Sequence, residues 1–345
     1  MANFTVTTNA DSGPGSLRQA VNDANSSGEA CTIEFDSDYT ITVISGQIII
    51  SCNLTINSLR KDITVNGNNA SRVFTISSGV TVTINELSIT GGFAGGGNGG
   101  AIDNWGTLNI TNSTLSNNSA THGGAISNSG TIKITNSTLS SNIASGCGGA
   151  IVNTGTINII NSTLSSNIAL GTTGWNNGAA IWNIGPINIS FSTIAENQAT
   201  PGAGIYGSNY NFKNSIVANN SNSNFDAVGT NSVSGINFST DNTCKGFKQI
   251  TADELRLAPL ALNSPGTTET HALLRGSRAI NTVTDYTDLD GNVVTTDQRG
   301  VSRPQQNAGD AGSYELIIHP ATKNRCSRCN KKAIKRWQYN VFYLE

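Results

Sequence analysis

The sequence predicts an all-β protein built as a parallel β-helix, a solenoid whose coils stack along one axis. The first observation is a phrase of about twenty residues that recurs with start-to-start spacings of 24, 25, 30 and 24 residues. A fixed period of this length indicates a repeat architecture. The second observation is the alternation of apolar and polar residues in stretches such as "GTIKITNSTL". Such alternation is typical of strands with one buried face.

Each repeat has room for one triangular coil. The repeats begin at Gly99, Gly123, Gly148, Gly178 and Gly202, and each predicts three short strands separated by Gly or Asn corners. A propeller blade would need about 40–45 residues and four strands. The longest interval contains "LGTTGWNNG" (170–178), which we interpret as a loop at one corner. The paired glycines before Ala-Ile are expected where the backbone turns without room for a Cβ atom.

Stacking explains why the phrase is repeated, because coils about 4.8 Å apart place like residues on like. We expect an internal aliphatic ladder of Leu115, Leu139, Leu164, Ile194 and Ile216. We expect an amide ladder of Asn118, Asn142, Asn167, Asn197 and Asn219 at a turn, where Asn tolerates left-handed geometry. Stacking alone explains both ladders, so the repeats do not by themselves indicate an enzyme.

The two ends of the chain differ from the repeats. The stretch "SLRQAVNDA" places Leu17, Ala20, Val21 and Ala24 on one helical face, and Ser16 with Gln19 has capping-box spacing. We therefore divide the chain into an N-terminal strand and capping helix (1–30), coils (31–245), a closing segment (246–318) and a basic tail (319–345). The tail carries a net charge of +6 against −8 for the rest (7 − 1 and 13 − 21), and we expect it to be mobile.

Composition argues against several classes of partner. Charged residues make up 12% of the chain, and between Gly95 and Thr200 only Asp103, Lys133 and Glu196 carry a charge. Such a surface has little field to attract nucleic acid or an anionic membrane. No apolar run approaches the ~18 residues of a membrane-spanning helix. The start, "MANFTVTTNADSG", lacks the basic and apolar regions of a signal peptide.

Several motifs together resemble a known group of proteins. "GPGSLRQAVNDAN" resembles the opening of bacterial surface β-helix proteins, and "GGAI" with "LSSN" resembles the paired motifs of polymorphic outer-membrane proteins. The stretches at 257–281 and 296–315 are similar to the closing segment of secreted β-helix proteins with interchangeable C-terminal anchors. The resemblance covers about residues 3–316. It implies a right-handed, single-stranded, pectate-lyase-like parallel β-helix, secreted or displayed at a bacterial cell surface, without implying one activity.

The expected function is non-enzymatic and adhesin-like, with a long polar face that binds a glycan or a protein, in a monomer. A polysaccharide lyase or glycoside hydrolase of the same fold is the alternative. Those reactions need clustered carboxylates. Asp103 and Glu196 are expected three coils, or ~14 Å, apart at different corners. A more remote alternative is ice binding by two threonine columns: Thr107, Thr131, Thr156 and Thr114, Thr138, Thr163.

Aromatic side chains are the candidate binding residues. They are Trp105, Trp175, Trp182 and Tyr206. Trp182 and Tyr206 occupy the same point of successive repeats, so we expect them to be neighbours. A row of aromatics on a polar face can bind glycans or a partner protein. Packing of the coil corner is the alternative interpretation.

The remaining candidates concern metals and the closing segment. Asp288, Asp290 and Asn292 resemble the start of a calcium loop. However, Val293 and Arg299 stand where such a loop needs Gly and Glu, so a solvated turn competes. No other cofactor is expected. We expect arginine–carboxylate pairs to pin the closing loop across the helix end, among Asp297, Arg299, Arg303, Asp310 and Glu315.

The cysteines and histidines carry weaker signals. Cys31, Cys52, Cys147 and Cys244 are expected to be reduced and mostly packed, with a Cys31–Cys52 bridge as the alternative. His122 and His271 have no obvious partners. His319 with Cys326 and Cys329 in the tail offers only half of a zinc site and no second pair exists, so we interpret these residues as part of a flexible tail, with metal or redox chemistry as the alternative.

Overall fold

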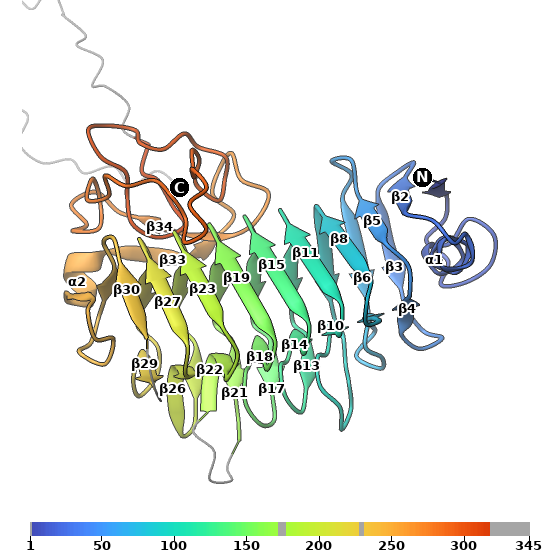
Figure 1. Ribbon diagram of the computed structural model, residues 1–345, viewed down its shortest axis with the longest axis horizontal. Helices are drawn as coiled ribbons and strands as arrows, with labels where there is room; N and C mark the ends of the chain where they lie inside the picture. Colours follow the sequence, from blue (N-terminus) through green and yellow to red (C-terminus); the bar gives the residue numbers. More distant parts are fainter. Residues whose placement is uncertain (1, 172–176, 228–230, 318–345) are drawn as a thin grey trace, which may run out of the picture.

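The computed structural model describes residues 2–171, 177–227 and 231–317, and it is a right-handed parallel β-helix (Figure 1). Three long parallel sheets form its walls, and a short fourth sheet lies at one corner. We call them sheets A, B, C and D. In the regular repeats the chain passes through sheet C, then A, then B, then D, and the next coil begins.

The strands follow the repeat. Sheet A contains β1 (Ala2–Val6), β2 (Cys31–Phe35), β5 (Leu54–Asn57), β8 (Thr81–Asn85), β11 (Thr107–Thr111), β15 (Thr131–Thr135), β19 (Thr156–Ile160), β23 (Ile187–Ser190), β27 (Tyr210–Lys213) and β30 (Ser232–Ser234). Sheet B contains β3 (Tyr39–Thr42), β6 (Ile63–Asn66), β9 (Leu87–Thr90), β12 (Thr114–Ser116), β16 (Thr138–Ser140), β20 (Thr163–Ser165), β24 (Thr193–Ala195), β28 (Ile216–Ala218), β31 (Phe238–Ser239) and β32 (Lys248–Gln249). Sheet C contains β4 (Ile48–Ile50), β7 (Phe74–Ile76), β10 (Ile102–Asn104), β14 (Ile126–Asn128), β18 (Ile151–Asn153), β22 (Asn177–Asn183), β26 (Gly202–Gly207) and β29 (Phe225–Ala227). Sheet D contains β13 (Ser119–Ala120), β17 (Ile143–Ala144), β21 (Ile168–Ala169) and β25 (Gln198–Ala199).

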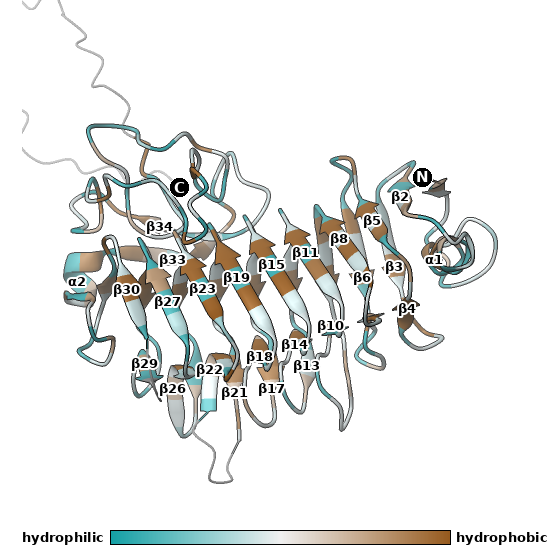
Figure 2. Ribbon diagram, viewed as in Figure 1, coloured by the Kyte–Doolittle hydropathy of each residue, from teal (hydrophilic) through white to brown (hydrophobic). Residues whose placement is uncertain are grey.

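Aliphatic ladders fill the interior. Leu115, Leu139 and Leu164 pair in register across β12, β16 and β20, and all three are fully buried. Figure 2 shows the hydrophobic and hydrophilic bands that alternate along the strands of sheet A. The ladder continues through Ile194, but its next member is Val217 and not Ile216 as expected. The coil from β24 to β28 is one residue longer than the sequence alignment assumed, so Ile216 lies on the outer face.

The amide ladder is also present, with a similar correction. Asn118, Asn142 and Asn167 are buried, and each side-chain amide donates to the Oδ1 atom of the next ladder asparagine at 2.8–3.0 Å. From Asn167 the ladder continues to Asn197 and then to Asn220, and not to Asn219 as expected. The expected left-handed geometry is wrong for the ladder itself, because the residue before each ladder asparagine has the positive φ, as at Asn117 (56°).

The structure contains two further ladders that were not predicted from the repeat. On sheet C, the amides of Asn104, Asn128, Asn153 and Asn183 are linked by hydrogen bonds of 2.6–2.8 Å. At the corner between sheets A and B, each backbone N–H donates to the next serine hydroxyl at 3.1–3.2 Å, through Ser113, Ser137, Ser162, Ser192 and Ser215. Buried polar groups are therefore satisfied coil to coil, which keeps the register fixed.

Separate elements close the two ends of the core. Helix α1 (Leu17–Ser26) buries the predicted face of Leu17, Ala20, Val21 and Ala24. The Ser16 hydroxyl accepts from the Gln19 N–H, but the Gln19 amide donates to Asp23, so only half of the predicted capping box forms. At the other end an aromatic cluster fills the last coils, with ring centroids 5.0–5.9 Å apart among Tyr210, Phe212, Phe225 and Phe247.

The closing segment lies along the side of the β-helix and not across its end as expected. After α2 (Ala252–Leu255), the chain forms the antiparallel hairpin of β33 (Leu257–Ala261) and β34 (Thr270–Leu273) and folds back over sheet B (Figure 1). His271 is buried between Ser165 Oγ (2.9 Å) and the Ala258 carbonyl (2.8 Å), so the expectation that it lacks partners is wrong. The closing segment thus packs on the outer face of sheet B, whereas the aromatic cluster fills the end of the core.

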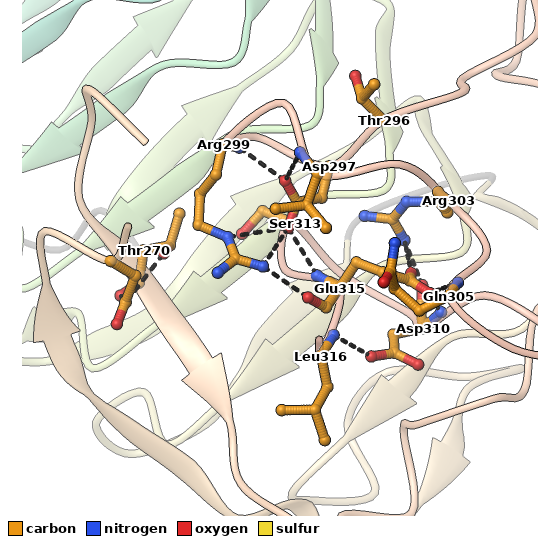
Figure 3. A network of polar contacts seen from close by, with 12 residues as sticks. Thr270, Thr296, Asp297, Arg299, Arg303, Gln305, Asp310, Ser313, Glu315 and Leu316 are labelled. Carbon is orange, nitrogen blue, oxygen red and sulfur yellow. Dashed lines mark hydrogen bonds and ion pairs between the residues drawn. The ribbon is translucent and has the colours of Figure 1, made fainter. Parts of the chain in front are cut away.

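Buried ion pairs hold this segment together, as predicted (Figure 3). Asp297 accepts from the Nε and Nη2 atoms of Arg299 at 2.9 and 2.6 Å. Arg303 lies 3.6 Å from the Glu315 carboxylate, and both side chains are inaccessible to solvent. Burial raises the pKa of the Asp310 and Glu315 carboxyls and lowers that of the Arg303 guanidinium. Their ionised forms are therefore held by mutual attraction and backbone donors against a desolvation cost.

One ion pair at the edge of the closing segment contributes stability that is lost at acidic pH. The Lys213 ammonium lies 2.8 Å from Asp285 and, with donors from Thr287, lowers the pKa of that carboxyl from 3.8 to about 2. A lowered folded-state pKa adds stability above pH 3.8, which is lost as the pH falls toward 2. We expect Asp285→Asn to cost less than about 1 kcal/mol at neutral pH, because the carboxylate is half exposed. Thermal unfolding of both chains from pH 6 to pH 2 checks this: a gap that widens on acidification would contradict it.

Within the described residues, no helix has the length and apolar character that a membrane crossing requires.

Candidate functional site

The outer face of sheet C carries the residues most suited to binding. Its central outward column consists of Asp103, Ser127, Val152, Trp182, Tyr206 and Asp226 in register. The alternation that points Ile181 into the core places Trp182 outward. Trp182 and Tyr206 are cross-strand neighbours, as the sequence predicts. The aromatic pair therefore follows directly from coil stacking.

A pocket of about 370 Å³ opens beside this pair. It is lined by Asn98, His122, Gly146, Cys147, Val152, Gly171, Asn177 and Trp182. These residues come from successive coils, at the passage from sheet D into sheet C. The lining combines one large aromatic ring with a few polar groups, which is the usual composition of small-ligand sites.

His122 and Cys147 form a neutral pair in the pocket. The His122 Nδ1 atom accepts from the Cys147 backbone N–H at 3.2 Å and lies 3.2 Å from its Sγ atom. An accepting Nδ1 places the ring proton on Nε2. Burial lowers the pKa of His122 and raises that of Cys147 to about 11. At neutral pH the pair thus provides an uncharged imidazole with an Nε2–H donor and an un-ionised thiol, which is a poor nucleophile.

Trp182 contributes a polar atom without a partner. Its Nε1 atom is buried, and no described residue accepts its hydrogen bond. A buried N–H without an acceptor costs about 1–3 kcal/mol, so its persistence calls for an explanation. The Trp182 indole ring lines the pocket, where the apolar face of a ligand can pack on it. Trp182 is therefore the central residue of the site.

Trp105 and Tyr206 are not among the described residues that line the pocket. Trp105 is 55% exposed after β10, and β10 lies three coils from β22; its Nε1 atom donates to Asp103 at 3.2 Å. Trp175 lies outside the described residues. The tail, with His319, Cys326 and Cys329, lies outside them as well. Cys31, Cys52, Cys147 and Cys244 are free thiols, so the alternative bridge between the first two is not formed.

Carboxylates are poorly placed for catalysis on this face. Asp103 and Asp226 lie at opposite ends of the outward column, five strand spacings or about 24 Å apart. A glycosidase pair requires about 5–9.5 Å. Asp103 lies 3.8 Å from Arg72, and Glu196 follows β24 in sheet B. The two carboxylates of the regular coils are thus far from each other, as the sequence predicts, but Asp103 lies within β10 and not at a corner as expected.

The proposed calcium loop is a hydrogen-bonded turn. The Asp288 Oδ1 atom accepts from the backbone N–H groups of Asp290 and Asn292 at 2.9 and 2.8 Å. Asp290 accepts from the side-chain amide of Asn158. The part of the chain that the structure describes contains no group of three His, Cys, Asp or Glu side chains able to hold a metal. These contacts form a turn, and calcium binding by Asp288, Asp290 and Asn292 stays a prediction.

Sequence reasoning missed most of the pocket. His122, Cys147 and Asn177 lie outside the repeated phrases on which the prediction of stacking was based. A usable signal was available, because His122 and Cys147 each precede a "GGAI" motif by 1 residue. Equivalent offsets in a stacked solenoid imply neighbouring positions.

Comparison with known proteins supports the fold and leaves the activity open. No protein-family model and no curated protein sequence matches the chain. Among solved structures, that of pectate lyase Pel9A has a TM-score of 0.50 at 13% identity, covering 91% of this chain and 96% of its own. The major allergen of cedar pollen has a TM-score of 0.47 at 14% identity, covering 73% and 82%. The chain thus has the pectate lyase-like, right-handed parallel β-helix fold.

Proposed function

We propose that this chain is an exported, non-enzymatic cell-surface protein, adhesin-like in character, that binds a glycan in the Trp182 pocket. The observation that carries the proposal is the Trp182 indole in the wall of a pocket of about 370 Å³, whose buried Nε1–H has no acceptor among the described residues. A sugar ring supplies both an apolar face for the indole and hydroxyl oxygens for its N–H and for His122 Nε2. The resemblance to bacterial surface β-helix proteins supports the exported location.

The described residues that line the pocket carry no charge, which supports a neutral ligand group. Burial keeps His122 and Cys147 uncharged at neutral pH, and the other lining residues are neutral. An anionic sugar would enter without a cationic partner here, at a desolvation cost. We therefore expect uncharged hydroxyl-rich sugars to bind in preference to uronates. The outward carboxylates are too far apart for hydrolysis by a carboxylate pair, so binding without turnover is the expected behaviour.

The test is a glycan array on the full chain, followed by titration calorimetry with the best-binding neutral oligosaccharide. Trp182→Ala is expected to weaken binding about thirtyfold, because removing a central aromatic anchor costs roughly 2 kcal/mol or more. Trp182→Phe keeps a ring but removes the N–H, and should lose a smaller part, about fivefold.

Trp105→Ala is the matched control, since it removes the same side chain from an exposed corner of the same sheet. Equal losses in the two alanine variants would contradict a site at Trp182. Cleavage of pectin, alginate or another polysaccharide by the unmodified chain would overturn the non-enzymatic assignment and favour a polysaccharide lyase.

A further inference from the structure

The outer face of sheet B carries a column of hydroxyl groups that is covered over only half of its length. The column consists of Thr40, Thr64, Ser88, Thr114, Thr138, Thr163 and Thr193, in register from β3 to β24. Thr138, Thr163 and Thr193 are at most 1% exposed, whereas the first four members are partly or fully accessible. Figure 1 shows the orange and red closing segment over the later coils, with the blue coils clear of it.

The covered half shows what this column binds. The Gln298 side chain joins two of its members, donating to Thr138 Oγ1 at 2.8 Å and accepting from Thr163 Oγ1 at 2.7 Å. Thr138 also donates to the Glu269 carbonyl at 2.6 Å. Ser313 contacts Thr163 and the next member of the column, Thr193. Its hydroxyl lies 2.9 Å from Thr163 Oγ1 and 3.1 Å from Thr193 Oγ1. Each hydroxyl thus meets an amide, a hydroxyl or a peptide carbonyl, and none meets a charge.

The open half leads into a groove at the edge of this interface. The groove has a volume of about 680 Å³, and Ser88 and Thr114 of the column belong to its lining. The closing segment forms one wall, through Leu262, Pro265, Gly266, Thr267 and Gln298. Gln298 therefore belongs both to the buried interface and to the groove. The unoccupied hydroxyls continue an interface that is already formed within the chain.

The chemistry of the groove favours an uncharged polypeptide. Arg60 and Lys61 are balanced by Asp62 and Glu86 at the same corner, between sheets A and B, so the lining has little net field apart from Arg299, which is paired with Asp297. The buried Oδ1 atom of Asn136, also in the lining, has no donor among the described residues, and a peptide N–H would satisfy it.

Two further features of the groove also favour a polypeptide as its ligand. Leu262 is 64% exposed and offers an apolar anchor. No described residue of the lining is aromatic, in contrast to the Trp182 pocket, so the groove lacks the flat platform on which a sugar ring packs.

We propose that the open hydroxyl column, with its groove, docks an uncharged Ser-, Thr- and Gln-rich segment of another protein, laid across sheet B as the Gln298 segment is. The partner repeats the contacts made by Gln298 and Ser313 one to three coils further toward the N-terminus. This surface is separate from the Trp182 pocket, so the inference does not depend on glycan binding.

The experiment uses a displayed library of random peptides selected on the full chain. Selected peptides are synthesised and titrated against the unmodified chain and Ser88→Arg, which places a long cation on the floor of the groove. Thr107→Arg is the matched control, because Thr107 points outward from sheet A, away from the groove. We expect selection of Ser, Thr and Gln, a loss of about tenfold or more with Ser88→Arg, and no change with Thr107→Arg or Trp182→Ala.

Three results would overturn the proposal. The first is a set of selected peptides that bind Ser88→Arg as well as the unmodified chain, or a selection that enriches no sequence. The second is loss of oligosaccharide binding, and not peptide binding, in Ser88→Arg, which would make the groove a glycan site. The third is self-association of the unmodified chain that Ser88→Arg abolishes, which would make the occupant a second copy. Circular dichroism spectra and melting temperatures of the two arginine variants establish that both remain folded.

Discussion

Asp297→Ala is expected to lower the free energy of unfolding by about 3–5 kcal/mol, because it leaves a buried arginine without its counter-ion. The Asp297 carboxylate is fully buried and accepts five hydrogen bonds. Three come from the backbone N–H groups of Arg299, Val301 and Glu315, and two from the Arg299 guanidinium. The substitution therefore removes both an ion pair and the acceptor that organises the loop.

Unfolding in guanidinium chloride measures the loss of free energy. Hydrogen exchange shows whether the loss is confined to the closing segment, 246–317. The double variant Asp297→Ala/Arg299→Met removes the orphaned charge and should recover part of the stability. Asp253→Ala replaces an exposed aspartate of α2 and serves as the control, with an expected change within about 0.5 kcal/mol. An Asp297 variant as stable as this control would show that the ion pairs do not hold the segment in place.

Leu139→Ala is expected to cost about 3–5 kcal/mol, the range for a leucine truncated in a core that cannot collapse around the cavity. Leu139 is fully buried between Leu115 and Leu164 in the aliphatic ladder. The coil spacing is set by backbone hydrogen bonds above and below, so its neighbours cannot move to fill the space.

The measurement is again chemical unfolding, with hydrogen exchange read coil by coil. Protection should fall most in β12, β16 and β20 and less in coils further away, because each coil contacts only its neighbours. Thr131→Ala, an exposed outward residue of sheet A in the same coil, is the control. If both variants lose the same free energy, the ladder is not the source of stability.

The sequence by itself determined which residues stack on one another in the regular coils. Residues at one offset of the repeat must stack, so Leu139 over Leu164 and Trp182 beside Tyr206 could be read from spacing alone. The same logic failed where the repeat loses its regular length, and the ladder members Val217 and Asn220 were each misplaced by one residue. The threonine columns show another limit. In the column of Thr114, Thr138 and Thr163, the last two are buried under the closing segment, which removes part of the flat face that ice binding would need.

Only the tertiary structure decided where the closing segment lies and which residues surround the pocket. The contact between Thr163 and Gln298 joins positions 135 residues apart, and no periodicity relates them. The neutral His122–Cys147 pair likewise depends on which side chains meet outside the repeated phrase. A repeat encodes contacts at one constant separation, so its pattern is visible in the chain. Docking of an irregular segment depends on shape, burial and hydrogen-bond partners that exist only after the coils have formed.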